Sequence, residues 1–393
     1  MRAPNVRSDF AVLWLCGLCL RITVLAIPPV IPLLHSDLAL TQTQVGTLTG
    51  LPVLLLSFAA IPGSFLIARF GAARVLIGGI LLAGLASSLR GFAIDATGLF
   101  AATFVMGAGI AVMQPAFPSI VRHWTPRDVG LATAIYSNGL LVGEALSASL
   151  TIPVVLPLVG GDWRRSLIAW SLPLFAIAAI AIAHARSRER RGHPRPTRAN
   201  PWWPDWRSPL TWRLGLIAGG CSSVYFGTNA FLPDYLRSQG REDLVGAALS
   251  ALNWMQIPAS LALLAFPRLM GTRAPLVAAG ALSTAAIVGL VVLPGAAAVV
   301  CAGVLGFCSA SVLILSLALP PLWVDGDRVH SVSAAVFAIG YLCAVFTPVV
   351  GGLAWDLSGL PWAAFVPSGA FGLVVLILAA SLERPPATRG ALS

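Results

Sequence analysis

The sequence predicts an all-α membrane protein with twelve transmembrane helices in two pseudo-symmetric, six-helix halves. Three observations predict this class. The 393 residues are 57% hydrophobic and only 10% charged, whereas soluble domains carry about 25% charge. Apolar runs of about 20 residues, long enough to cross a bilayer, recur along the whole chain. Short motifs in the first half also return in the second half at one nearly constant offset.

The apolar runs define the individual spans. Each run is long enough for a transmembrane helix. An even number of spans places both chain ends on the same side of the membrane. The twelve predicted spans are residues 10–34, 45–68, 74–94, 98–121, 129–155, 165–184, 212–236, 244–267, 274–294, 296–321, 331–355 and 362–382.

The arginines predict the orientation of the spans. Those expected on one side are Arg2, Arg7, Arg69, Arg74, Arg122, Arg127, the cluster from Arg186 to Arg213, Arg268, Arg273, Arg328, Arg384 and Arg389. Those expected on the other side are Arg90, Arg164, Arg165, Arg237 and Arg241. By the positive-inside rule both termini lie in the cytoplasm of a bacterial cell, with the chain in the inner membrane. The net charge of +10 is then a topology signal and not a nucleic-acid surface.

The halves are joined by the one long polar connection. We expect a first half at 1–184, a cytoplasmic linker at 185–211 and a second half at 212–393, because the linker is rich in Arg and Pro and cannot bury a core. "ATAIYSNG", ending at Gly139, returns as "SAAVFAIG", ending at Gly340. Parallel repeats of this kind build transporters that work by alternating access.

Two charges deep inside the spans, Arg21 and Glu144, indicate the chemistry of the site. Arg21 lies about 11 residues into the first span, near mid-membrane at 1.5 Å per residue. Inserting an arginine there costs about 2.5–3.5 kcal/mol, so it should face a watery cavity and have a partner. Glu144, in a span of the same direction, lies at a depth that two long side chains can bridge. The pair is either purely structural, or Arg21 contacts an anionic or electron-rich solute with its planar donor fork while Glu144 holds it between transport events or carries a proton.

Uncharged polar residues inside other spans are candidates for solute binding. Tyr225 and Asn229 are spaced i, i+4, and Asn253 and Gln256 are spaced i, i+3, so each pair shares a helix face. For each residue the alternative is an interhelical hydrogen bond. The predicted binding set is Arg21, Gln114, Tyr225, Asn229, Asn253, Gln256 and Tyr341.

Several strings together resemble one branch of the major facilitator superfamily, the cyanate and 2-nitroimidazole permease-like transporters. The first span reads "LRITVLAIPPVIPLL", with Arg21, Pro29 and Pro32 at the spacing of the branch. Further strings that match are "LTGLPVL" at 48–54, "DVGLATAIY" at 128–136, "DWRRSLIAWSLP" at 162–173, "IPAS" at 257–260 and "GYLCAVFTPVVGGLAWDLSG" at 340–359. The resemblance covers essentially the whole chain.

The resemblance implies the major facilitator fold and further roles for individual residues. Helices 1, 4, 7 and 10 line the cavity in this fold, which favours Gln114, Tyr225 and Asn229 as binding residues. The loop after the second span, "SFLIARFG", is similar to the superfamily's gating loop. The gating residues implied are Arg69, Gly71 and Arg74.

The predicted function is secondary active transport of a small anionic or polar organic solute by alternating access, with proton coupling as an open alternative. The partners expected are the solute, protons in the coupled case and the lipid bilayer, with no nucleic acid, no cofactor and a monomeric state. A Walker motif and a catalytic cluster are absent from the sequence, which argues against ATP-driven pumping and against an enzyme. The alternatives are a drug or nitroimidazole-type exporter, or a transporter-like receptor or channel.

Overall fold

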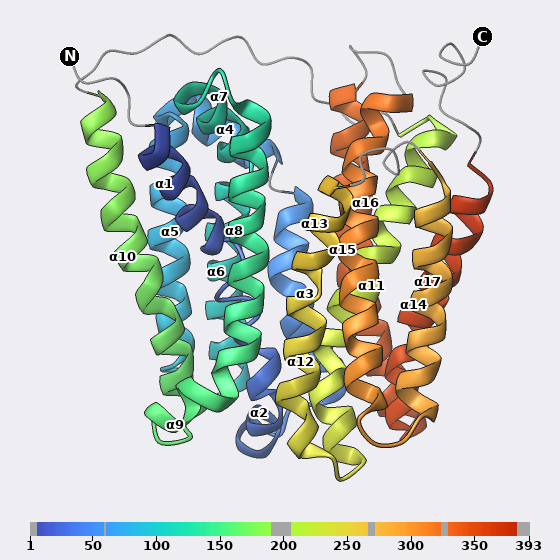
Figure 1. The fold of residues 1–393 in the computed structure, drawn as a ribbon. Coiled ribbons are helices and arrows are strands. Elements are labelled where there is room, and N and C mark those ends of the chain that lie inside the picture. The colour runs from blue at the N-terminus through green and yellow to red at the C-terminus, as the bar shows by residue number, and fades with distance from the viewer. Residues whose placement is uncertain (1–5, 59, 190–205, 266–271, 324–328, 383–393) are drawn as a thin grey trace, which may run out of the picture. The chain divides into compact units, whose positions relative to one another are not determined.

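The computed structural model describes residues 6–58, 60–189, 206–265, 272–323 and 329–382. Within these ranges the chain forms helices and turns and no strand, so the all-α prediction is confirmed (Figure 1). The chain divides into two compact units, Met1–Ala39 with Phe58–Arg198, and Leu40–Ser57 with Ala199–Ser393. Most of the predicted linker lies outside the described residues, and the sequence-based domain boundaries stay a prediction.

The first unit holds the helices of the first half except the one that begins at Gln42. Its elements are α1 (Val6–Leu18), η1 (Pro28–Val30), α2 (Ile31–Leu38), α4 (Ala60–Phe70), α5 (Ala72–Arg90), α6 (Ala96–Met113), α7 (Ala116–Trp124), α8 (Val129–Leu150), the π-helix η2 (Thr151–Val155), α9 (Leu156–Leu158) and α10 (Trp163–Glu189).

The second unit holds α3, up to Ser57, and all helices of the second half. Its elements are α3 (Gln42–Phe58), α11 (Pro209–Ser238), η3 (Glu242–Leu244), α12 (Val245–Trp254), α13 (Gln256–Ala265), α14 (Ala274–Val292), α15 (Ala297–Trp323), α16 (Val329–Ser358), η5 (Pro361–Phe365) and α17 (Val366–Ala380).

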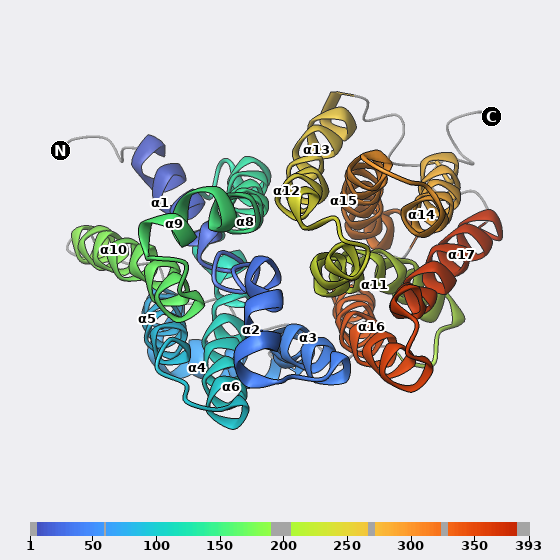
Figure 2. The same cartoon turned by 90° about the horizontal axis from the view of Figure 1, so that it is seen from below.

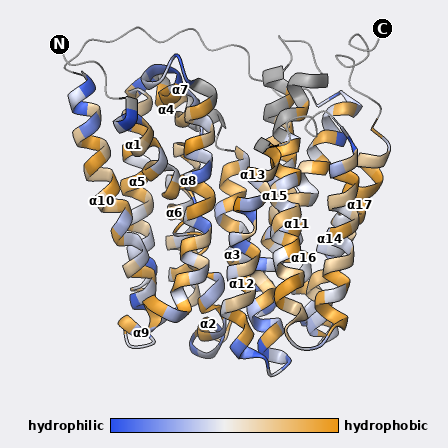
Figure 3. Ribbon diagram, in the orientation of Figure 1, coloured by the Kyte–Doolittle hydropathy of each residue, from blue (hydrophilic) through white to orange (hydrophobic). Residues whose placement is uncertain are grey.

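Long apolar helices account for most of the structure. Eight helical stretches in the described part of the chain are long and apolar enough to cross a membrane. Figure 3 shows hydrophobic colour along these helices and hydrophilic colour at both ends of α10. In the hydrocarbon region of a bilayer a helix satisfies its own backbone hydrogen bonds, so apolar segments of this length form helices. The stretches are Ala72–Arg90, Ala96–Trp124, Leu131–Leu158, Trp163–Arg188, Ala274–Val292, Ala297–Ser316, Ala335–Ser358 and Pro361–Ala380.

The two units repeat the same packing. In the first, α1 packs on α8 and α5 packs on both α6 and α10; in the second, α11 packs on α16 and α14 packs on both α15 and α17 (Figure 2). The repeated glycines stand at equivalent contacts. A Cβ atom at Gly139 of α8 would overlap the carbonyl of Trp14, and one at Gly340 of α16 would touch the Cβ of Ala218 at 3.6 Å. The internal repeat in the sequence therefore corresponds to a repeat in helix packing.

Irregular backbone is prominent in the first unit. The α-helix of the first span ends at Leu18, and residues 19–27 form turns before Pro28. The fourth span breaks between α6 and α7, and the fifth contains the π-helix η2. By contrast, α11 and α16 each run unbroken for 30 residues. π-Helical turns and broken transmembrane helices are frequent at functional sites, which directs attention to the first unit.

Candidate functional site: a buried ion pair at a broken helix

Arg21 lies in the irregular segment between α1 and η1. Several backbone bonds here span three residues instead of four, such as Arg21 N–H to the Leu18 carbonyl at 3.2 Å and Val24 N–H to the Arg21 carbonyl at 3.0 Å. Pro28 and Pro29 lack the N–H groups that would continue an α-helical ladder. The sequence "RITVLAIPP" therefore accounts for the break in the helix. As a result, Arg21 lies on a backbone that is not regular α-helix.

Arg21 and Glu144 form a buried ion pair. Arg21 Nε lies 3.4 Å from Glu144 Oε1, and the two side chains are only 7% and 4% exposed. The packing of α8 on α1 brings them together, since a Cβ at Gly143 would stand 2.7 Å from the Leu18 carbonyl oxygen. The small residues Gly139 and Gly143 thus let α8 approach the first span closely. Glu144 directly follows Gly143 in α8, so it lies beside the break between α1 and η1.

The stability of the first unit should depend on both members of this ion pair. Removing one partner of a buried pair leaves an uncompensated charge and costs about 3–5 kcal/mol. A guanidinium has five N–H donors in a planar fork, and the Glu144 carboxylate lies 3.4 Å from the Nε of Arg21. An anion that enters this site can compete with Glu144 for the guanidinium. This geometry suits reversible binding of a carboxylate, nitrate-like or similar planar group.

Four of the predicted binding residues form a buried network in the second unit. The Tyr225 hydroxyl donates to Asn253 Oδ1 at 2.5 Å, and Asn253 Nδ2 donates to Asn229 Oδ1 at 3.1 Å. Asn229 Nδ2 bonds the Tyr225 carbonyl, and Gln256 Nε2 lies 3.4 Å from the Asn253 carbonyl. The network joins α11 to α12 at the point where the eighth span breaks into α12 and α13. Amides and a phenol held in this way can offer hydrogen bonds to a polar solute, or can simply join two helices.

The remaining predicted residues lie at separate positions. Gln114 is half-buried at the break between α6 and α7, and Tyr341 of α16 stacks on Phe337 with ring centroids 6.1 Å apart. Arg69 and Arg74 are exposed on either side of the turn from α4 to α5. Gly71 in that turn has φ +84°, a conformation that costs other residues free energy, so a local backbone requirement already explains this glycine.

Comparison with known proteins decides the family. Residues 13–305 match the sequence model described as Major Facilitator Superfamily. The chain belongs to the Major Facilitator Superfamily. It is 27% identical to the 2-nitroimidazole transporter of Escherichia coli (strain K12), over 86% of each chain. It is 26% identical to the cyanate transport protein CynX of the same strain, over 93% of this chain and 95% of that one. The crystal structure of a D-xylose–proton symporter superposes with a TM-score of 0.74 at 13% identity, covering 98% and 99% of the two chains.

These findings confirm the predicted fold class and the resemblance to the cyanate and 2-nitroimidazole permease-like branch. The protein is a multi-pass membrane transporter of a small molecule and not an enzyme.

The structure of this Major Facilitator Superfamily transporter reveals a second buried arginine. From the sequence, Arg90 is counted only among the arginines expected on the non-cytoplasmic side, but the residue ends α5 with 0% exposure and its side chain is turned into the first unit. Its Nη2 donates to the Thr23 carbonyl at 2.9 Å and to Ser87 Oγ at 2.8 Å. A sequence signal was available, because Arg90 lies inside the predicted span 74–94 and not beyond its end.

The sequence also did not predict a polar cluster at the N-terminal end of α1. Asp9, 1% exposed, accepts hydrogen bonds from His184 Nε2 at 2.8 Å and from Arg188 Nε at 3.0 Å. Arg188 also bonds the Trp124 carbonyl at 3.0 Å. The cluster fastens α1 to α10 and α7. The sequence signal is Asp9, a single acid at the start of an apolar helix.

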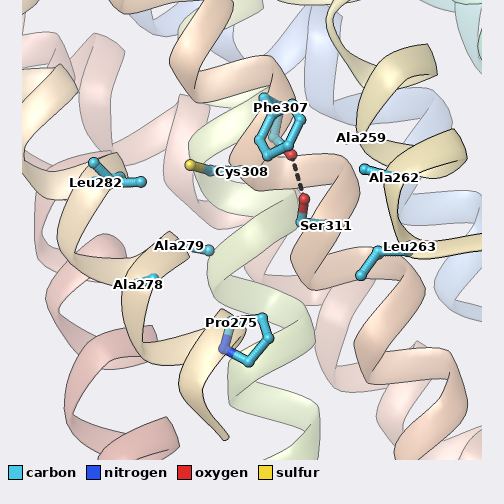
Figure 4. A pocket seen from close by; sticks show the side chains of 10 residues that line it. All are labelled: Ala259, Ala262, Leu263, Pro275, Ala278, Ala279, Leu282, Phe307, Cys308 and Ser311. Atoms are coloured by element: carbon cyan, nitrogen blue, oxygen red, sulfur yellow. Dashed lines mark hydrogen bonds between the residues drawn. The ribbon is translucent and has the colours of Figure 1, made fainter. Parts of the chain in front are cut away.

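The second unit of the transporter also contains an apolar cavity of about 180 Å³ between α13, α14 and α15 (Figure 4). Its lining is mostly alanine, leucine and phenylalanine, and the Ser311 hydroxyl already bonds the Phe307 carbonyl at 2.8 Å. None of the predicted binding residues lines this cavity, and it offers no charged group to a polar solute.

Proposed function

We propose that this transporter moves a small anionic or polar organic solute across the bacterial inner membrane by alternating access, with Arg21 as the main contact for the solute. The observation that carries the proposal is the buried Arg21–Glu144 pair at 3.4 Å in the break of the first span. Intramembrane arginines are expensive and normally mark a solute or ion pathway. The relatives support the class of solute, since one is a cyanate transport protein.

Competition for Arg21 explains how the site is used. In the empty state Glu144 neutralises the guanidinium. An arriving anion takes over donors of the fork and frees the Glu144 carboxylate. The freed carboxylate can then accept a proton, so the anion and the proton move together. Proton coupling through Glu144 is the finer part of this proposal, and exchange without protons is its alternative.

The remaining predicted binding residues complete the proposal. Tyr225, Asn229, Asn253 and Gln256 offer hydroxyl and amide groups to the polar parts of the solute, as do Gln114 and Tyr341. The amides and phenols can donate or accept hydrogen bonds according to the solute. Alanine at Asn253 should break the α11–α12 network and raise KM, whereas a purely structural network would lower stability and leave KM unchanged.

A second candidate function is export of drugs or nitroimidazoles. It is favoured by the relative that is a 2-nitroimidazole transporter. A nitro group presents two electron-rich oxygens in a plane, and the guanidinium fork can donate to both. The two functions differ in direction and in the net charge of the solute, so transport assays separate them.

We propose that both termini and the segment 185–211 are cytoplasmic and that the protein works as a monomer. Reporter fusions at residues 2, 195 and 388 should then all report cytoplasm, because arginine is abundant near each of these positions. In the same topology Arg69, Gly71 and Arg74 form a cytoplasmic gating loop. A periplasmic signal at residue 195 would contradict the arrangement of six plus six spans.

The central experiment is uptake by proteoliposomes containing the purified protein. Labelled cyanate, nitrate and 2-nitroimidazole are the probes, with the wild type, Arg21→Lys and Arg21→Ala as variants. Both substitutions should abolish most anion uptake, because a point charge does not reproduce the planar fork. Arg165→Ala is the matched control, since Arg165 is an arginine of the same unit with a 71% exposed side chain. Full uptake with normal KM in Arg21→Ala would refute the role of Arg21.

A further inference from the structure

Arg90 stabilises the break in the first span. In a continuous helix the Thr23 carbonyl would accept the N–H of Ile27, four residues on. In this structure Ile27 N–H instead lies 3.4 Å from the Val24 carbonyl, and Arg90 Nη2 donates to Thr23 at 2.9 Å. The guanidinium therefore takes the place of a lost backbone donor. An unsatisfied carbonyl in the hydrocarbon region costs several kcal/mol, so this contact helps to fix the irregular backbone.

The bonded carbonyl is close to Arg21 along the chain. Thr23 follows Arg21 by two residues, and two residues of extended chain span at most about 7 Å. The head group of Arg90 is thus anchored next to the backbone that carries Arg21. Ser87, one turn earlier on α5, accepts a second hydrogen bond from the same Nη2.

The charges around the break do not balance. Glu144 offsets Arg21. Among the described residues no carboxylate lies within ion-pair distance of Arg90, and its Nε and Nη1 have no hydrogen-bond partner there. Arg90 keeps its proton at any physiological pH. Two guanidinium groups and one carboxylate leave one positive charge in excess in a buried region.

An excess buried charge lowers the stability of the first unit, so its presence calls for a functional explanation. A buried charge without a partner is strongly destabilising, and an apolar residue of similar size is often neutral or stabilising at such a position. An arginine whose only purpose was to bond one carbonyl could be replaced by an uncharged donor. The charge itself is therefore the feature that needs an explanation.

We propose that Arg90 is a positioning residue for Arg21 and the source of the charge that makes the site select anions over neutral solutes. This inference rests on the proposed function of Arg21. Through Thr23, Arg90 holds the broken segment in the shape that presents Arg21. Its field acts on the bound solute: a unit charge about 10 Å away, at an effective dielectric constant of about 20, changes anion affinity by about tenfold.

The test separates the charge of Arg90 from its hydrogen bond. Arg90→Lys keeps the charge and a donor, Arg90→Gln keeps a donor without charge, and Arg90→Met keeps neither. Ser87→Ala is the matched control, because it leaves the bond to Thr23 in place. For each purified variant the KM for nitrate, the KM for 2-nitroimidazole and the kcat are measured in proteoliposomes, together with the thermal unfolding midpoint.

The expected result is a change in selectivity that follows charge. Arg90→Gln and Arg90→Met should both raise the ratio of the KM for nitrate to the KM for 2-nitroimidazole about tenfold. Arg90→Met also loses the donor to the Thr23 carbonyl and should therefore lower kcat for both solutes, whereas Arg90→Gln should not. Arg90→Lys should stay near the wild type in selectivity, and Ser87→Ala should as well. Either charge-free variant suffices for the comparison if the other cannot be purified.

The result that would overturn the inference is an unchanged ratio of the two KM values in the charge-free variants, whatever happens to the unfolding midpoint. Equal losses for Lys, Gln and Met with a lower midpoint would overturn it as well, because they indicate a purely structural arginine. The failure of the proposed function looks different: the wild type itself would transport no anion, or Arg21→Ala would transport normally.

Discussion

Breaking the ion pair of Arg21 and Glu144 should show strong coupling between the two residues. At the observed 3.4 Å and an effective dielectric constant of about 20, the Coulomb attraction is about 5 kcal/mol. Each single variant, Arg21→Gln or Glu144→Gln, should lose about 3–5 kcal/mol of stability, because the remaining charge is left buried without its partner. The double variant should lose much less than the sum, since neither charge remains.

A double-mutant cycle measures this coupling. Unfolding of the purified protein by increasing SDS in mixed micelles, followed by tryptophan fluorescence, gives the free energies for the four proteins. Coupled neighbours differ from additivity by about 0.5–3 kcal/mol, and we expect a value at the upper end. The pair of Arg165 and Asp162, 3.6 Å apart but 71% and 38% exposed, is the control and should couple by less than about 1 kcal/mol. Additive losses for Arg21 and Glu144 would refute the reasoning and leave Arg21 to be balanced by solute, water or carbonyl groups.

Three other predictions concern coupling, packing and pH. Glu144→Gln should keep solute exchange but lose uphill uptake driven by a pH gradient in proteoliposomes; unchanged gradient-driven uptake would exclude the proton role. Gly139→Val should lower the unfolding free energy by about 1–3 kcal/mol, because its side chain would overlap the backbone of α1, whereas Gly78→Val, with open space around the Cβ position, should not. The hydrogen bond from Arg164 lowers the pKa of the Asp37 carboxyl, so its contribution to stability is complete above the usual pKa of about 4 and disappears as the pH falls through the lowered value. Asp37→Asn should therefore unfold at a lower temperature than the wild type at pH 7 and at the same temperature in strong acid; a difference that persists in acid would contradict this.

The class of the protein and its main candidate residues could be predicted from the sequence. Apolar length and low charge determine a bundle of membrane helices, because an apolar run of about 20 residues satisfies its backbone in lipid by forming a helix. The depths of Arg21 and Glu144 could be estimated by counting residues along two spans of the same direction. The proline pair after Arg21 also favours an irregular backbone, because proline has no N–H group to continue an α-helical ladder.

The partners of most polar side chains were decided only by the tertiary structure. Arg90 was counted among the arginines on one side of the membrane, yet its side chain turns inward from the end of α5 to the Thr23 carbonyl. Asn253 and Tyr225 were each placed on a helix face, but the hydrogen bond between them depends on how α11 and α12 approach each other. The hydropathy profile along the sequence gives the approximate depth of a residue in the membrane. It does not give the rotation of each helix about its axis or the reach of a long side chain, and these two quantities determine which buried groups meet.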